Sequence, residues 1–222
     1  MTFRDRFPVD LDSRALTDLA PRARIWKGAR IGTQGELCEN VYIIAEGQVL
    51  LSRRNAEGED YALYLLGPGD LFGEGSLSRQ RRWLVSARAM TDGVVHVLPA
   101  GQLPRFAQFY PQLTAHIVTL LSSRLERAHL RLDIVTTDSA RGRLLSILAV
   151  LADYHGETRD GARWLPMRLT QAELGSMVGL ARETVARTLA ELEADGIIRR
   201  QGRRGLWLFH VPDADVPADT PE

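Results

Sequence analysis

The chain has 222 residues, with 28 basic and 28 acidic side chains that leave no net charge. Apolar residues make up 45% and charged residues 25%, which is ordinary for a globular protein with room for two small domains. No apolar run reaches the roughly 18 residues of a membrane-spanning helix, and the first residues lack the order of a secretory signal. Cys38 is the only cysteine, which excludes an internal disulfide and a thiolate-only zinc or iron–sulfur site. We therefore expect a cytoplasmic protein with no membrane contact and no metal.

Short apolar runs separated by glycines fill the first half of the chain. Four of these runs have the length of strands and are rich in branched or aromatic residues, at 41–44, 49–51, 61–66 and 94–98. Glycines between the runs supply the turns that hairpins require. Strands at this spacing are typical of a sandwich or a jelly roll. We predict a β jelly-roll domain over residues 1–110.

The pattern changes at Pro111, where a segment without glycine or further proline begins. Its apolar residues follow a heptad seam with alternating steps of three and four: Val118, Leu121, Leu125, Ala128, Leu132 and Val135. A second stripe, formed by Leu113, Ile117 and Leu120, lies beside the first half of the seam. We predict a dimerisation helix over residues 111–137, with the second stripe facing the β-domain and the seam facing a partner helix. The alternative is one wide stripe that faces the core of a monomer.

Residues 138–211 carry the signals of a winged helix-turn-helix domain. Asp138-Ser139 offers an N-cap to a new amphipathic helix. Thr170 and Glu173 then form a capping box, in which each side chain satisfies a backbone N–H group at the start of a short helix. Gly179 permits the tight turn that ends this helix.

A second helix is predicted from about residue 182 to residue 194. Two apolar runs, at 197–198 and 206–209, flank Gly202 and look like the strands of a wing. Residues 212–222 hold three prolines and four acidic residues, so we expect a disordered acidic tail.

In a helix-turn-helix, the start of the second helix enters the major groove of DNA. Arg182, Glu183 and Arg187 share one side of this helix, opposite the apolar residues Val185 and Leu189. Arginine donates two hydrogen bonds to a guanine edge and glutamate accepts one from cytosine, so we predict that these three residues read bases. The predicted contacts to the DNA backbone are Thr170, Gln171, Thr184, Arg199, Arg200, Arg203 and Arg204. The alternative is that these three residues form ion pairs at the surface of a helix whose only role is to pack against the core.

The sequence resembles the cyclic-AMP receptor protein/fumarate–nitrate regulator family over roughly residues 22–210. The motifs that carry the resemblance are the segment GPGDLFGE at 67–74, Gly142-Arg143, Val178-Gly179, and RETV at 182–185 followed by Arg187. The resemblance implies an α+β protein that forms a homodimer through the long helix and binds a palindromic TGTGA/TCACA site beside promoters as a transcription activator. It also implies that an exposed loop over residues 154–163 contacts RNA polymerase.

The resemblance further implies where an effector would bind. In the cyclic-nucleotide-binding members, a glutamate at the position of Glu74 holds the ribose hydroxyl, and an arginine near position 83 or 84 holds the cyclic phosphate. This chain has Trp83 and Leu84 there, and Ala128-His129 where a base-contacting pair would lie. Because an arginine–phosphate contact is among the strongest polar contacts, we expect no cofactor and no high-affinity response to cyclic AMP. Cyclic AMP as effector is the alternative, and the candidate pocket residues are Glu74, Arg82, Trp83 and His129.

Other sensing chemistries have weaker support. A haem would need an axial ligand, for which His96, His116 and His129 are candidates. Cys38 could be a redox thiol, but no basic residue close in the sequence would lower its pKa. A small-molecule sensor that acts through a protein partner is a further alternative. The motifs of phosphate-binding loops, zinc proteases and nucleophile elbows do not occur, so we do not expect an enzyme.

Overall fold

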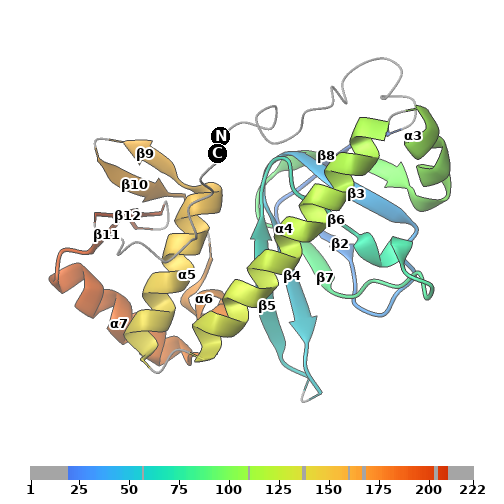
Figure 1. Cartoon of the computed structure of the whole chain (residues 1–222). Helices are drawn as coiled ribbons and strands as arrows, with labels where there is room; N and C mark the ends of the chain where they lie inside the picture. The colour runs from blue at the N-terminus through green and yellow to red at the C-terminus, as the bar shows by residue number, and fades with distance from the viewer. Residues whose placement is uncertain are drawn as a thin grey trace. The chain divides into compact units, whose positions relative to one another are not determined.

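The computed structural model describes residues 20–56, 58–109, 111–136, 139–159, 161–166, 169–202 and 205–209 (Figure 1). They form two compact units, one that ends at Ala128 and one that begins at His129. We term these the N-terminal unit and the C-terminal unit. No helix among the described residues is both long and apolar enough to cross a membrane. The predicted acidic tail, residues 212–222, lies outside the described residues.

The N-terminal unit contains two antiparallel sheets of four strands each, in the orders β1-β8-β3-β6 and β2-β7-β4-β5. The strands are β1 (Arg22–Ile25), β2 (Arg30–Gly32), β3 (Asn40–Glu46), β4 (Val49–Arg54), β5 (Asp60–Leu66), β6 (Leu71–Phe72), β7 (Ser86–Ala89) and β8 (Gly93–Pro99). The four strands predicted from the sequence are β3, β4, β5 and β8. The predicted jelly roll is confirmed.

Strand β3 is buried on both of its faces. Ile44 packs in the core between the two sheets, together with Leu51 of β4 and Phe72 of β6. Its neighbours Val41 and Ile43 belong to a second apolar cluster, on the side of the sheet that the helices cover. Because successive side chains of a strand point to opposite faces, both faces must be apolar, which explains the unbroken apolar run at 41–44.

Two helices cover this outer face, α3 (Leu103–Phe109) and α4 (Pro111–Thr136), after the short 3₁₀ turns η1 (Glu74–Leu77) and η2 (Ala100–Gln102) (Figure 1). Phe106 of α3 and Ile117 of α4 complete the cluster around Val41 and Ile43. Leu120 of α4 packs against the same cluster, so the second stripe faces the β-domain as predicted. The side chain of Leu113, the third member of that stripe, is outside the described part of the chain.

The predicted dimer seam lies on the exposed side of α4. Val118, Leu125 and Leu132 are 59%, 59% and 61% exposed, although they are large apolar residues. Leu121 and Val135 are half-buried, and Leu121 contacts the β-domain cluster. Among the described residues, the core thus covers part of the seam at Leu121 and leaves Val118, Leu125 and Leu132 exposed.

The C-terminal unit contains α5 (Ala140–His155), α6 (Gln171–Val178), α7 (Arg182–Ala194) and a four-stranded sheet. The sheet has the order β11-β12-β10-β9, with β9 (Glu157–Arg159), β10 (Ala162–Leu165), β11 (Ile198–Arg200) and β12 (Leu206–Leu208). Ser139 caps α5, because its hydroxyl accepts a hydrogen bond from the Gly142 N–H at 3.0 Å. All three helices bury apolar side chains, which include Leu144, Leu148, Leu174, Val178, Val185, Leu189 and Leu192.

The expectation of a loop over residues 154–163 is wrong in secondary structure, although residues 157–159 are exposed. His155 ends α5, and β9 and β10 form a hairpin that adds two strands to the wing sheet. Trp164 of β10 is the register partner of Trp207 of β12, and their ring centroids lie 5.0 Å apart. This pairing joins segments far apart in the sequence, so the local pattern of polar residues did not reveal it.

Candidate nucleic-acid interface

The capping box at the start of α6 is present in full. The Thr170 hydroxyl accepts a hydrogen bond from the Glu173 N–H at 3.1 Å, and the Glu173 carboxylate accepts one from the Thr170 N–H at 2.8 Å. These bonds satisfy backbone groups that a helix start would otherwise leave without partners. The first helix of the motif therefore begins at a fixed position.

A glycine inside α6 fixes how closely the two helices approach each other, and its role was not predicted from the sequence. Gly175 lies inside α6, and a Cβ atom there would be 2.4 Å from the Leu180 carbonyl oxygen and 3.1 Å from Cγ2 of Val185. Only glycine allows this contact between α6, the turn and α7. The turn itself passes through Gly179, whose φ of +67° is in the left-handed region. A glycine in the middle of a short helical pattern was the available signal.

The start of α7 presents the three predicted base-reading residues to solvent. Arg182, Glu183 and Arg187 are exposed, while Val185 on the opposite side is fully buried. The N-cap residue, Ala181, makes no side-chain cap, so the first turn of α7 keeps N–H groups and a positive dipole end that favour phosphate. Thr184 lies half-buried in the same turn.

The alternative, in which these residues form a surface ion-pair cluster, would add little to the stability of the fold. Arg187 Nε lies 3.8 Å from Glu191 Oε1, and both side chains are more than half exposed. Pairs of this kind stabilise a protein by about 1 kcal/mol or less. Both groups can therefore turn to another partner at low cost. Of the predicted backbone contacts on α6, Thr170 is exposed and Gln171 is half-buried.

The wing arginines have different surroundings. Arg200 donates to Glu193 of α7 from its backbone N–H at 2.8 Å and from Nε at 2.6 Å, and these bonds hold the pKa of Glu193 below its usual value. Arg199 is exposed, with its guanidinium 5.3 Å from the ring centre of Phe209. The side chain of Arg200 is thus bonded to α7, whereas that of Arg199 is exposed beside Phe209. Arg203 and Arg204 lie outside the described residues.

The four residues predicted to line an effector pocket lie in different surroundings. Trp83 is only 6% exposed and stacks on Tyr42 in the core between the sheets. Its ring covers Gly32, where a Cβ atom would be 2.1 Å from the indole. Arg82 is exposed and donates from Nη1 to the Gly35 carbonyl oxygen at 2.6 Å. His129 belongs to the C-terminal unit and is exposed.

The fourth candidate, Glu74, is paired inside the N-terminal unit. Its Oε2 atom lies 2.9 Å from Nη1 of Arg124 on α4, and the two side chains are 21% and 13% exposed. One turn further on, Nη2 of Arg127 lies 3.2 Å from Oδ1 of the buried Asp70. Neither arginine was predicted from the sequence, where the available signal is two basic residues three positions apart that continue the face of the second stripe.

Two of the remaining sensor candidates are core residues. Cys38 is 1% exposed, its thiol donates to the Gly73 carbonyl oxygen at 3.4 Å, and burial raises its pKa. His96 is also 1% exposed, with Nδ1 3.3 Å from the Ala20 carbonyl oxygen. The side chain of His116 lies outside the described residues.

Comparison with known proteins matches both parts of the chain. Residues 23–110 match the model of the cyclic nucleotide-binding domain, and residues 142–214 match the Crp-like helix-turn-helix domain. The cyclic AMP receptor protein of Thermus thermophilus is 34% identical over 78% of this chain and 77% of its own length. The CRP-like cAMP-activated global transcriptional regulator of Mycobacterium tuberculosis is 32% identical over 80% of this chain and 79% of its own length.

The chain belongs to the cyclic-AMP receptor protein/fumarate–nitrate regulator (CRP/FNR) family. It is therefore a DNA-binding transcription regulator, and α6 and α7 are its helix-turn-helix. Solved structures have the same fold. A CRP/FNR-family transcriptional regulator from Thermus thermophilus has a TM-score of 0.68 at 27% identity, over 86% of this chain and 94% of that one. FixK2 from Bradyrhizobium japonicum has a TM-score of 0.74 at 22% identity, over 86% and 93%.

Two residues of the predicted effector region have partners within the chain itself. The aromatic residue at position 83 belongs to the core of the β-domain, and the glutamate of the GPGDLFGE segment has an arginine partner on α4. Both features lie within the N-terminal unit.

Proposed function

We propose that this regulator binds DNA as a homodimer on a palindromic TGTGA/TCACA site, activates transcription and does so without a bound cyclic nucleotide. The observation that carries the proposal is the exposed set of Arg182, Glu183 and Arg187 at the start of α7, in a domain of the Crp-like class. Their donor and acceptor groups match guanine and cytosine edges in the major groove.

Dimerisation is supported by the exposed seam of α4. Isolated exposed leucines are common, but apolar residues repeated at heptad spacing along one helix face are typical of a coiled coil. Val118, Leu125 and Leu132 form such a row. Two copies related by a two-fold axis would present two α7 helices to half-sites about one helical turn apart, roughly 10–10.5 base pairs.

DNA binding without effector is supported by the ion pair between Glu74 and Arg124. The carboxylate that would bind a ribose hydroxyl already has a cationic partner on α4, at 2.9 Å. A nucleotide would have to replace this pair without an arginine at position 83 or 84 to hold its phosphate. Arg124 thus links the β-domain to α4 at the place where a bound effector would otherwise make that link.

Cyclic-nucleotide-dependent activation is the second candidate function. The names of the relatives from Thermus thermophilus and Mycobacterium tuberculosis refer to cyclic AMP, and Glu74 is present in this chain. In that case, Arg82 would have to leave Gly35 and turn inward to hold the phosphate. A sensor that acts only through a protein partner would leave the arginines of α7 without a role.

The test is the affinity of the purified protein for a palindromic and a scrambled DNA duplex, with and without cyclic AMP. We expect the palindrome to bind at least tenfold more tightly without nucleotide, with a steep dependence on salt from phosphate contacts. A large gain in affinity on addition of cyclic AMP would favour the second candidate. Equal and salt-insensitive binding of both duplexes would contradict specific DNA recognition.

A further inference from the structure

A polar hollow lies on the N-terminal unit, where β2, β4 and β7 meet the turn that follows β2. Its volume is about 430 Å³, within the range of small-molecule sites, about 300–1,000 Å³. Three arginines and one aspartate line it, with hydroxyl and amide side chains between them. Among the described residues that line it, none is aromatic, and Ala87 has the one apolar side chain. A ligand of this hollow must therefore be polar throughout and cannot rely on stacking.

The charges of the hollow favour an anion. Arg30 of β2 and Arg88 of β7 are direct register partners, so their side chains leave the same face of the sheet. Ala87 packs in the core between the sheets, which places its neighbour Arg88 on the outer face. An anion at this face of the sheet would meet both guanidinium groups, whose planar forks match anionic oxygens.

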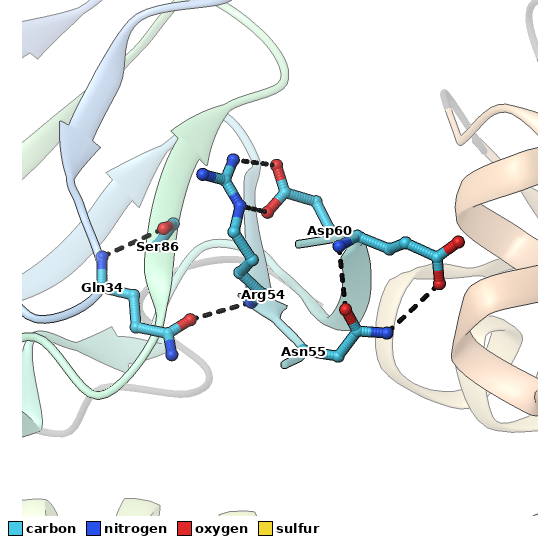
Figure 2. Close-up of polar contacts among 6 residues, drawn as sticks. Gln34, Arg54, Asn55, Asp60 and Ser86 are labelled. Carbon is cyan, nitrogen blue, oxygen red and sulfur yellow. Dashed lines mark hydrogen bonds and ion pairs between the residues drawn. The ribbon is translucent and has the colours of Figure 1, made fainter. Parts of the chain in front are cut away.

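The third arginine is held in place by Asp60, whose carboxylate also lines the hollow. Arg54 donates to Asp60 from Nε and Nη2, both at 2.9 Å, and Figure 2 shows the two groups face to face. The bonds from Arg54, with a smaller contribution from the charge of Arg30, hold the pKa of Asp60 below its usual value. With three cations and one anion, the described side chains that line the hollow carry an excess of two positive charges.

Hydrogen bonds order the polar groups of the hollow. The backbone N–H of Gln34 donates to the Ser86 hydroxyl at 3.0 Å, and the Gln34 side-chain oxygen accepts from the backbone N–H of Arg54 at 2.8 Å (Figure 2). A hydroxyl that accepts such a bond still has its own proton to donate. Arg82, at the edge, holds the carbonyl oxygen of the lining residue Gly35.

We propose that this hollow binds a small phosphorylated metabolite that lacks an aromatic base. The guanidinium groups of Arg30 and Arg88 would hold its phosphate groups, because the planar fork of arginine matches phosphate oxygens. The hydroxyls of Thr33 and Ser86 and the amide of Gln34 suit the hydroxyl groups of a sugar phosphate. The hollow is distinct from the region of Glu74 and Arg124, and the proposal does not depend on DNA binding.

Calorimetry of the full chain at about 0.15 M salt, where exposed charges are already screened, provides the test. The probes are inorganic pyrophosphate, a sugar bisphosphate and the same sugar without phosphate. We expect saturable binding of at least one phosphorylated probe and none of the free sugar. Preference for the bisphosphate would identify a sugar phosphate as the ligand class, and preference for pyrophosphate an inorganic one.

Three variants make the test specific. Replacing both Arg30 and Arg88 with Gln should weaken binding at least tenfold, whereas Arg24→Gln with Arg53→Gln removes the same charge from exposed arginines outside the hollow and should leave it unchanged. Asp60→Asn should strengthen binding, because it frees Arg54. The proposal is overturned if neither phosphorylated probe binds, if sulfate competes equally well, or if the control pair weakens binding as much.

Discussion

Glu74 Oε2 lies 2.9 Å from Arg124 Nη1, and this ion pair joins η1 of the β-domain to the middle of α4. The guanidinium of Arg124 also donates to the Leu71 carbonyl oxygen and lies 5.9 Å from the ring centre of Tyr64. Both charged side chains are largely shielded from water. Breaking a shielded pair costs more than breaking an exposed one, because the remaining charge stays without its partner.

We therefore predict that Glu74→Gln lowers the free energy of unfolding by about 1–3 kcal/mol. Urea titration followed by circular dichroism measures this change. The matched control is Glu46→Gln, which breaks an exposed pair with Arg22 at 3.6 Å and should have no measurable effect. Equal effects of the two substitutions would mean that the Glu74 pair contributes no more than an ordinary surface contact.

The seam of α4 leads to a prediction about assembly. Leu125→Glu together with Leu132→Glu should convert the protein to a monomer and weaken its DNA binding, because each charge would face its symmetry mate. Sedimentation velocity measures the change in mass. Leu130→Glu is the control, since Leu130 is exposed on the same helix but lies off the seam. A double variant that still sediments as a dimer would contradict the proposed interface.

The β9–β10 hairpin leads to a prediction about transcription. Glu157, Thr158 and Arg159 are all exposed, and Arg159 donates to the Glu157 carboxylate from Nε at 3.0 Å. If RNA polymerase contacts this hairpin, replacing the three residues with alanine should reduce activated transcription in vitro and leave promoter affinity unchanged. Because the hairpin extends the wing sheet, thermal unfolding must be compared as well. Parallel losses of affinity and activation would assign the hairpin a structural role.

The contact between α7 and the wing depends on pH. Hydrogen bonds from Arg200 lower the pKa of Glu193, so the carboxylate stabilises the folded state above its ordinary pKa of 4.5. This contribution is lost as the pH falls through the lower value of the folded state. Glu193→Gln should therefore reduce the free energy of unfolding at pH 7, and the difference from the unchanged protein should vanish in acid. A difference that stays constant down to pH 3 would contradict this assignment.

Signals close together in the sequence predicted the local structure of this protein well. The capping box of Thr170 and the apolar spacing around Val185 were sufficient to place α6 and α7. Contacts between distant segments were not predicted. Trp83 was named only as a candidate pocket residue, and the sequence did not reveal that its ring packs on Tyr42 of β3. The pairing of Trp164 with a distant strand escaped prediction for the same reason.

The last prediction separates residues that read bases from residues that hold the DNA backbone. Arg182 is exposed at the first position of α7 and has the geometry to donate two hydrogen bonds to one guanine. Arg199 is exposed on the wing, where it can reach a phosphate, which positions a domain without selecting sequence. Arg182→Ala should cost about 1–3 kcal/mol of binding free energy on the palindrome and relax the preference at one base pair.

Arg199→Ala should instead weaken all duplexes alike and reduce the slope of affinity against salt by about one counterion. Fluorescence anisotropy on the palindrome, on single-base variants and on a scrambled duplex, at several salt concentrations, measures both effects. Arg187→Ala serves as a second test of base reading, because Arg187 lies one helical turn beyond Glu183 on the same exposed side. If Arg182→Ala lowered affinity equally for the palindrome and the scrambled duplex, α7 would be an electrostatic anchor and specificity would have to come from DNA shape.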